Sequence, residues 1–173
     1  MGNASLIDQT GKKFQLNDAK GKVVIATFVY TKCPDVCPLF TAKFASIQRT
    51  LEGAEKGRKP NNDKQSVDYL LLTITTDPEY DTPAQLKSYA YHFKPDFSRW
   101  LFLTGPKEEL AKVWADFGVH VRKAADGHVQ HTALTTLIDR RGVRRVDYYG
   151  DKWQEKELLR DLFSLAERGQ PAD

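Results

Sequence analysis

Residues Val23–Pro38 read VVIATFVYTKCPDVCP, and this stretch decides how the chain folds. Its first eight residues are apolar, β-branched or aromatic almost throughout, which predicts a strand buried in the middle of a sheet. They lead directly to Cys33 and Cys37, the only two cysteines of the chain. The apolar side chains that follow recur at helical spacing. Two thiols are therefore expected where a central strand ends and a helix begins.

The remaining segments alternate between strand and helix patterns, which is typical of a layered α/β domain. Strands are expected at 67–75, 100–104, 119–123 and 133–138, helices at 38–51, 83–92, 106–117 and 153–168, and hairpins at 6–16 and 133–149. The polar stretch 52–66, with two glycines and a proline, predicts an exposed loop. A strand, a dithiol and a helix in this order resemble the thioredoxin-like fold. We therefore expect a central β-sheet flanked by helices, with an N-terminal β-hairpin.

Length and composition limit the possible functions. The 173 residues suit one domain, 1–173, and 40% hydrophobic residues are enough for a packed core at that length. A formal net charge of +3 without a basic stripe gives no case for binding nucleic acid. No apolar stretch approaches the roughly 18–20 residues that span a bilayer, and no signal-peptide pattern is visible. We expect membrane contact only through an anchor that is absent from this chain.

The spacing of Cys33 and Cys37 limits their chemistry. A disulfide between them would close a loop of three intervening residues, which removes little chain entropy and so stabilises the fold little. Redox or metal chemistry is the better interpretation. On the first turn of a helix their Cα atoms would lie about 6 Å apart on one face, within reach of a disulfide or a shared ion. A helix N-terminus favours thiolates, and among soft metals Cu(I) is the leading candidate.

A third ligand would have to come from one of four histidines. His92 and His120 are interpreted as surface or structural residues. His128 and His131 lie in a predicted loop that enters a late strand, and in thioredoxin-like domains that segment lies beside the dithiol. His131 stands nearest the strand, so it is the candidate ligand. His128 is kept as an auxiliary.

The motif Cys33–Pro38 resembles the dithiol motif of the Sco/SenC copper proteins. Those proteins assist assembly of the binuclear copper centre, CuA, in subunit II of cytochrome c oxidase. Residues 76–83, TDPEYDTP, are similar to the family's acidic segment. His131–Thr132, followed by residues 137–139, is similar to its histidine loop and hairpin. With the opening hairpin, the similarity spans about residues 5–166.

This resemblance implies that Cys33, Cys37 and His131 bind copper, as Cu(I) and also as Cu(II). It implies a copper chaperone that delivers copper to, or matures, the CuA site of subunit II or another copper protein, assisted by a thiol reductant. It further implies a location on the periplasmic side of the bacterial inner membrane or in the mitochondrial intermembrane space, and we expect a monomer. Asp77 is interpreted as ordering a turn near the site. One residue departs from the family: an acidic residue often precedes the histidine, whereas Gln130 supplies no charge.

Two alternatives stay open at the level of the sequence. The same dithiol would serve a thiol–disulfide oxidoreductase that keeps the partner's copper-binding cysteines reduced. Cys33 and Cys37 would then be the catalytic residues, and His131 would be dispensable. A peroxidase is a weaker alternative, because no arginine stands near the motif to activate a cysteine. Whether the chain is an enzyme is thus an open question here.

Overall fold

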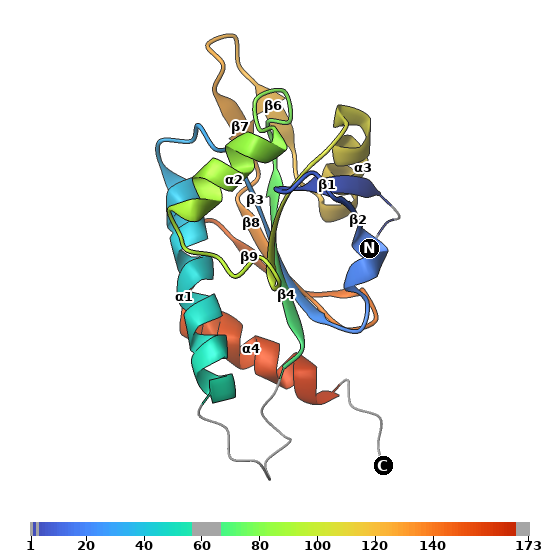
Figure 1. The fold of residues 1–173 in the computed structure, drawn as a ribbon, viewed down its shortest axis with the longest axis vertical. Coiled ribbons are helices and arrows are strands. Elements are labelled where there is room, and N and C mark those ends of the chain that lie inside the picture. The colour runs from blue at the N-terminus through green and yellow to red at the C-terminus, as the bar shows by residue number, and fades with distance from the viewer. Residues whose placement is uncertain (1, 3, 57–66, 169–173) are drawn as a thin grey trace.

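The computed structural model describes residue 2 and residues 4–56 and 67–168. The strands are β1 (Ser5–Asp8), β2 (Lys13–Gln15), β3 (Val23–Val29), β4 (Tyr69–Thr75), β5 (Trp100–Thr104), β6 (Val121–Lys123), β7 (Val129–His131), β8 (Leu134–Ile138) and β9 (Arg144–Tyr149). The helices are α1 (Val36–Lys56), α2 (Pro83–Tyr91), α3 (Lys107–Phe117) and α4 (Glu155–Arg168), and a short 3-10 helix, η1, spans Leu16–Ala19. The described strands form one seven-stranded sheet, in the order β2-β1-β5-β4-β3-β8-β9, and a separate pair, β6-β7 (Figure 1).

The central strands are covered on both sides. β3, β4 and β5 run parallel, whereas β8 pairs antiparallel with β3. Every residue of β3 and β4 is buried, as an apolar run without alternation predicts. Because alternate residues point to opposite faces, Val23 and Ile25 join one core while Val24 and Phe28 join the other. Helices α1, α2 and α4 cover the first face and α3 covers the second (Figure 1). The predicted α/β fold is confirmed.

Local sequence explains where two helices start or stop. Thr82 precedes α2, and its side-chain oxygen accepts a hydrogen bond from the Gln85 backbone N–H at 3.3 Å. Pro83 then occupies the first helical position, where its missing N–H costs nothing. Gly118 ends α3 in the left-handed conformation, with φ of 67°, which glycine adopts without steric cost. These ends agree with the positions expected from the sequence.

The start of α1 differs from the prediction. The helix begins at Val36 rather than at Pro38, so Cys37 lies in its first turn. Cys33 precedes the helix and lies in the loop that follows β3. The predicted start at Pro38 is therefore two residues late, and the case in which both thiols share one helical turn does not occur. The two thiols are brought together by the loop between β3 and α1 rather than by helical spacing.

The end of α1 also differs. The helix continues to Lys56, so the loop predicted at 52–66 is wrong for 52–56, and residues 57–66 lie outside the described part of the chain. Gly53 sits inside the helix, although glycine costs about 1 kcal/mol there relative to alanine. A tertiary contact offsets this cost, because the Glu55 carboxylate pairs with Arg99 at 2.7 Å. The sequence pattern carries no sign of that contact.

The segment that carries His131 is a strand rather than the predicted loop. β7 pairs antiparallel with β6, and Val121 lies opposite His131. Each strand has only three residues, too few to show a hydrophobic period. The hairpin packs beside the end of β3, where Val129 joins a small apolar cluster with both cysteines (Figure 1).

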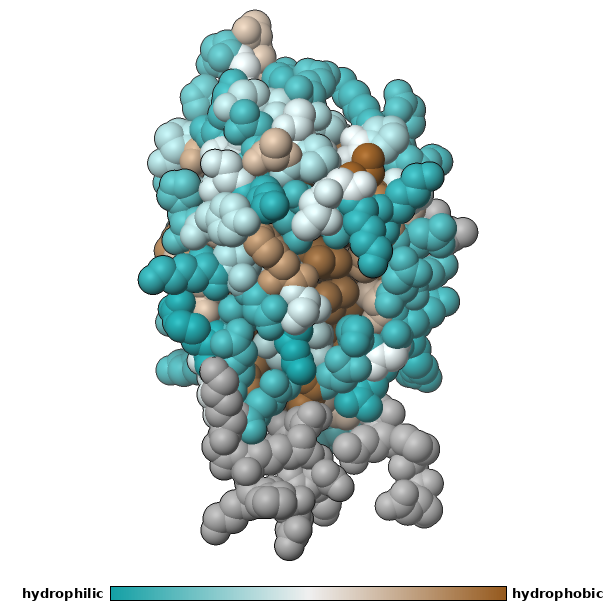
Figure 2. Space-filling model, in the orientation of Figure 1, coloured by the Kyte–Doolittle hydropathy of each residue, from teal (hydrophilic) through white to brown (hydrophobic). Residues whose placement is uncertain are grey.

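The face of the molecule drawn in Figure 2 is mainly polar. Charged and polar residues cover most of it, and the largest apolar patch lies near its middle (Figure 2). Across the described residues, no helix combines the length and the apolar character that crossing a bilayer requires.

Candidate metal centre

The thiol loop, residues 31–38, connects the end of β3 to the first turn of α1. Both cysteines are free. Cys37 is fully buried, whereas Cys33 keeps 9% of its surface exposed. Val29 of β3 and Val129 of β7 pack against the pair. One thiol can therefore meet a partner in solution, while the other is shielded.

The pKa values of the two thiols are shifted in opposite directions. The Cys37 thiol donates a hydrogen bond to the Cys33 sulfur, and this bond is the largest influence that lowers the pKa of Cys33. Backbone N–H groups of Asp35 and Cys37 and the Tyr30 hydroxyl act in the same direction. Giving that hydrogen bond, together with burial, raises the pKa of Cys37. Cys33 is thus the thiolate, the species that attacks a disulfide or binds a soft metal.

His131 points its ring at the buried thiol. Its Nδ1 lies 3.0 Å from the Thr132 carbonyl oxygen, and its Nε2 lies 3.8 Å from Cys37 Sγ. A carbonyl only accepts hydrogen bonds, so Nδ1 carries the hydrogen and the Nε2 lone pair faces the sulfur. Burial lowers the pKa of His131, so the ring is neutral at pH 7, as a metal ligand must be.

The distance between Cys37 and His131 suits a shared ion. An ion about 2.3 Å from a sulfur and about 2.0 Å from a nitrogen, with an angle of about 120° between them, holds the two atoms about 3.7 Å apart. The separation of 3.8 Å from Cys37 Sγ to His131 Nε2 matches this value. Hydrogen bonding of Nδ1 to a carbonyl is the usual way in which a protein orients a ligating imidazole.

The third donor, Cys33, lies beside this pair. Within residues 2, 4–56 and 67–168, no three His, Cys, Asp or Glu side chains already converge on one point as metal ligands do. Cys33 packs with Cys37 in the small apolar cluster and lines the same hollow as His131. The structure therefore brings Cys33, Cys37 and His131 together, with the Cys37–His131 pair already spaced for a ligand.

The other three histidines lie outside this arrangement. His92 and His120 are exposed, in line with their interpretation as surface residues, and His92 Nδ1 bonds to the Ser88 carbonyl at 3.1 Å. His128 lines a hollow of about 380 Å³ beside Cys33, but its Nδ1 meets the Tyr30 hydroxyl at 3.4 Å rather than a sulfur.

Tyr30 is a site residue that the sequence analysis missed. It is buried, it precedes the thiol loop, and its hydroxyl bonds to Cys33 and to His128. Its ring meets the His131 ring edge to face, with 6.1 Å between centroids. Burial and the neighbouring Cys33 charge raise the pKa of Tyr30 to about 12, so the hydroxyl keeps its hydrogen and donates it. The only signal in the sequence is a polar aromatic residue at the end of an apolar strand.

Gln130 lies at the rim of the hollow beside Cys33, and its side chain bonds to Arg122 rather than to a thiol. It lies opposite Arg122 in the β6–β7 pair, and its side-chain oxygen accepts a hydrogen bond from the Arg122 guanidinium at 2.7 Å. Both residues are exposed. Since neighbouring residues of a strand point to opposite faces, the position before His131 belongs to the outer face of the hairpin.

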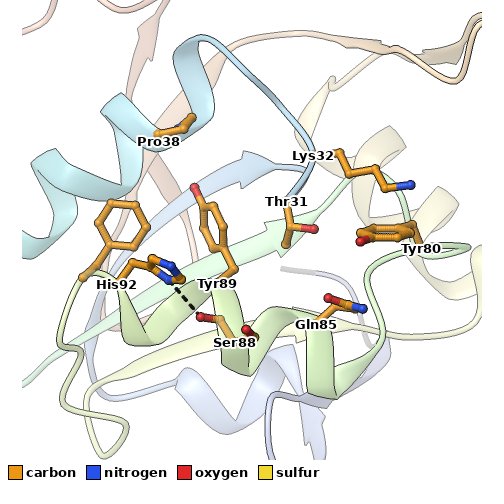
Figure 3. Close-up of a pocket in the computed structure, with 9 residues that line it drawn as sticks. Thr31, Lys32, Pro38, Tyr80, Gln85, Ser88, Tyr89 and His92 are labelled. Carbon is orange, nitrogen blue, oxygen red and sulfur yellow. Dashed lines mark hydrogen bonds between the residues drawn. The ribbon is translucent and has the colours of Figure 1, made fainter.

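A second hollow, of about 400 Å³, lies on the α2 side of the thiol loop (Figure 3). Lys32 of the loop places its ammonium 3.5 Å from the Tyr80 ring centroid at one end of this hollow. Tyr89 and His92 line it from the helix side (Figure 3). The thiol loop is therefore flanked by open space on two sides.

Known proteins share both the sequence pattern and the fold. A protein-family model described as SCO1/SenC matches residues 1–167. A SCO1/SenC family lipoprotein from Bacillus anthracis str. Ames is 33% identical, with a TM-score of 0.84 over 96% of this chain and 95% of that one. Bradyrhizobium japonicum ScoI, with copper bound, is 31% identical, with a TM-score of 0.77 over 95% of this chain and 98% of that one. BsSco is described as a member of the Sco family of cytochrome c oxidase assembly proteins with a disulfide switch. It is 28% identical, with a TM-score of 0.76 over 94% of this chain and 90% of that one.

Proposed function

Because the chain belongs to the SCO1/SenC family, we propose that it is a copper chaperone that binds copper through Cys33, Cys37 and His131. The observation that carries the proposal is the 3.8 Å separation of Cys37 Sγ and His131 Nε2, with Nδ1 held by the Thr132 carbonyl. Two sulfurs and a neutral imidazole suit Cu(I), which prefers soft ligands. The same three donors would hold Cu(II). The copper in Bradyrhizobium japonicum ScoI supports copper as the cargo.

Delivery would begin at Cys33. This thiol is the more exposed of the pair, so a ligand of a partner protein would replace it first. The exposed Asp35 and Gln130 flank the opening and form the docking rim. We propose the copper-binding cysteines of the CuA site in cytochrome c oxidase subunit II as the recipient, which the description of BsSco supports. The lipoprotein relative supports a place on the outer side of a bacterial inner membrane, and the mitochondrial intermembrane space is the corresponding alternative.

The proposal predicts the result of a copper titration. The fully reduced protein should bind one Cu(I) per chain, and X-ray absorption should show two sulfur ligands and one nitrogen ligand, because Cys33 joins the preset pair. Protein alkylated at both cysteines is the control and should bind none. A copper shell made of oxygen and nitrogen alone would contradict the proposal.

A thiol–disulfide oxidoreductase is the second candidate. The hydrogen bond between Cys37 and Cys33 favours it, because a thiolate beside a second thiol is the reduced half of a redox pair. In this function the Cys33 thiolate attacks a partner disulfide, and Cys37 then displaces the partner as a thiolate. The protein ends as a Cys33–Cys37 disulfide and the partner as two thiols. A bound metal and this disulfide are alternative states of one pair, so both functions can belong to one protein.

Replacing His131 separates the two candidates. The His131→Ala variant should lose the nitrogen ligand and bind Cu(I) about tenfold or more weakly, about 1.4 kcal/mol. Its reduction of a small model disulfide should stay within about twofold of wild type, because neither reacting sulfur is changed. His128→Ala is the matched control and should bind copper as wild type does. A chaperone function is wrong if wild type and His131→Ala reduce the disulfide equally well and neither binds copper.

A further inference from the structure

The hairpin that carries His131 is separate from the main sheet. Among the described residues, β6 and β7 pair only with each other. Lys123 lies opposite Val129, and Val121 lies opposite His131. Directly opposed residues share a face of a strand pair, as do residues two apart, so these four side chains lie on one face. That face packs on the thiol loop through its two valines.

An acidic turn, Asp77–Asp81, meets this face at Lys123. The Lys123 ammonium lies 2.8 Å from Asp77 Oδ1 and 2.9 Å from Glu79 Oε2. The Asp77 side chain is only 6% exposed, and its backbone N–H donates to Thr75 Oγ1 at 2.9 Å. A fixed and buried partner loses less to screening and to side-chain entropy than an exposed one. The Lys123–Asp77 pair is thus a firm attachment for the hairpin.

The same acidic turn holds the thiol loop. Asp81 is fully buried and accepts hydrogen bonds from the Thr31 backbone N–H at 3.2 Å, from the Thr31 hydroxyl, and from the Thr75 hydroxyl at 2.6 Å. Thr31 stands two residues before Cys33. The Asp81 backbone N–H donates to the Asp77 carbonyl at 2.8 Å, so both carboxylates belong to one hydrogen-bonded turn.

We propose that Lys123 is a positioning residue that sets where His131 stands over the thiols. The acidic turn holds the thiol loop with Asp81 and the hairpin with Asp77, so the Lys123–Asp77 pair controls the distance between the imidazole and the sulfurs. Without Lys123, the hairpin keeps its valine contacts and the His128–Tyr30 hydrogen bond but loses its ion pairs with the acidic turn, and His131 samples a wider range of positions. The inference rests on the proposed function only where it takes His131 as a copper ligand.

The test compares Lys123→Met with wild type, both reduced and metal-free. Methionine keeps the length of the stem and removes the charge. Amide hydrogen exchange of residues 121–131 should become about tenfold faster, because local opening of the hairpin costs less. Exchange in β3 and β4 and the midpoint of thermal unfolding should stay as in wild type. Cu(I) should bind about fivefold more weakly, with a less ordered nitrogen shell in X-ray absorption.

Two variants serve as controls. Lys107→Met removes the other lysine that pairs with Glu79, at 3.0 Å, but this lysine belongs to α3 and does not reach the hairpin. It should leave hairpin exchange and copper binding unchanged. Lys123→Arg keeps the charge and should restore most of the protection that Lys123→Met loses. In a double-mutant cycle, Asp77→Asn should add little in the Lys123→Met background, because its ion pair with Lys123 is already lost there.

Each outcome decides the inference. Equal hairpin protection in wild type and Lys123→Met would overturn it, as would additive effects in the double-mutant cycle or equal losses in Lys107→Met. If wild type binds no copper, the proposed function fails, whereas the exchange experiment still reports on the hairpin. If wild type binds copper and Lys123→Met changes neither exchange nor the nitrogen shell, the positioning role alone is wrong.

Discussion

Exchanging Cys37 for serine is expected to abolish Cu(I) binding, with a loss in affinity of about a thousandfold or more, or about 4 kcal/mol. A serine hydroxyl stays protonated at neutral pH and is a poor ligand for a soft ion. Cys37 is the centre of the arrangement, since it meets the Cys33 sulfur on one side and His131 Nε2 at 3.8 Å on the other. Titration with a competing Cu(I) chelator measures the loss, and circular dichroism confirms that the fold is kept.

Cys33→Ser is the matched variant. It should lose copper to the same extent, but the two variants should differ toward an alkylating reagent. Cys37→Ser keeps Cys33, which is 9% exposed and has a lowered pKa, and should react faster, whereas Cys33→Ser keeps only the fully buried Cys37 and should react slowly. Tight one-to-one copper binding by either variant would exclude a site that needs both thiols.

Replacing Trp100 with alanine should lower the free energy of unfolding by about 3–5 kcal/mol. Its side chain is fully buried on β5, its ring stacks on Phe102 with centroids 5.0 Å apart, and its indole N–H donates to Thr73 Oγ1 at 2.9 Å. The substitution leaves a large cavity and removes the indole N–H that donates a hydrogen bond to the buried Thr73 hydroxyl. Urea unfolding, followed by far-ultraviolet circular dichroism, should show a lower midpoint with an unchanged slope.

Tyr91→Ala is the control for that measurement, because Tyr91 is also aromatic but is 58% exposed. Tyr91→Ala should lower the free energy of unfolding by less than about 1 kcal/mol. A loss below about 1.5 kcal/mol for Trp100→Ala would mean that this side of the core is packed far less tightly than described.

The parts of the fold that local sequence controls could be predicted. The run Val23–Val29 is apolar except for Thr27 because both of its faces are buried, and the structure shows it buried at every position. Thr82 and Gly118 mark helix ends through their own side chain and backbone conformation. The continuation of α1 past Gly53 could not be predicted, because the Glu55–Arg99 ion pair found there joins residues that are distant in sequence.

The candidate site divides in the same way. The spacing of Cys33 and Cys37 is visible in the sequence, and the place of His131 nearest the predicted strand, together with the resemblance to a family, favoured it over His128. The structure places the His131 ring beside Cys37 and turns His128 to Tyr30. Tyr30 and Lys123 were missed because Tyr30 meets His128 and His131, and Lys123 meets Asp77, all from segments far along the chain. A single sequence records residue types but not such pairings.

The isolation of β6 and β7 from the main sheet affects how cargo could leave the protein. Lifting the imidazole away from the sulfurs would break no hydrogen bond of the seven-stranded sheet, and of the core beside α3 it would uncover only the contact made by Val121. The energetic barrier to release is therefore set mainly by the hairpin and only weakly by global unfolding. A variant made much more thermostable through its core should hand over its ion as fast as the parent protein does.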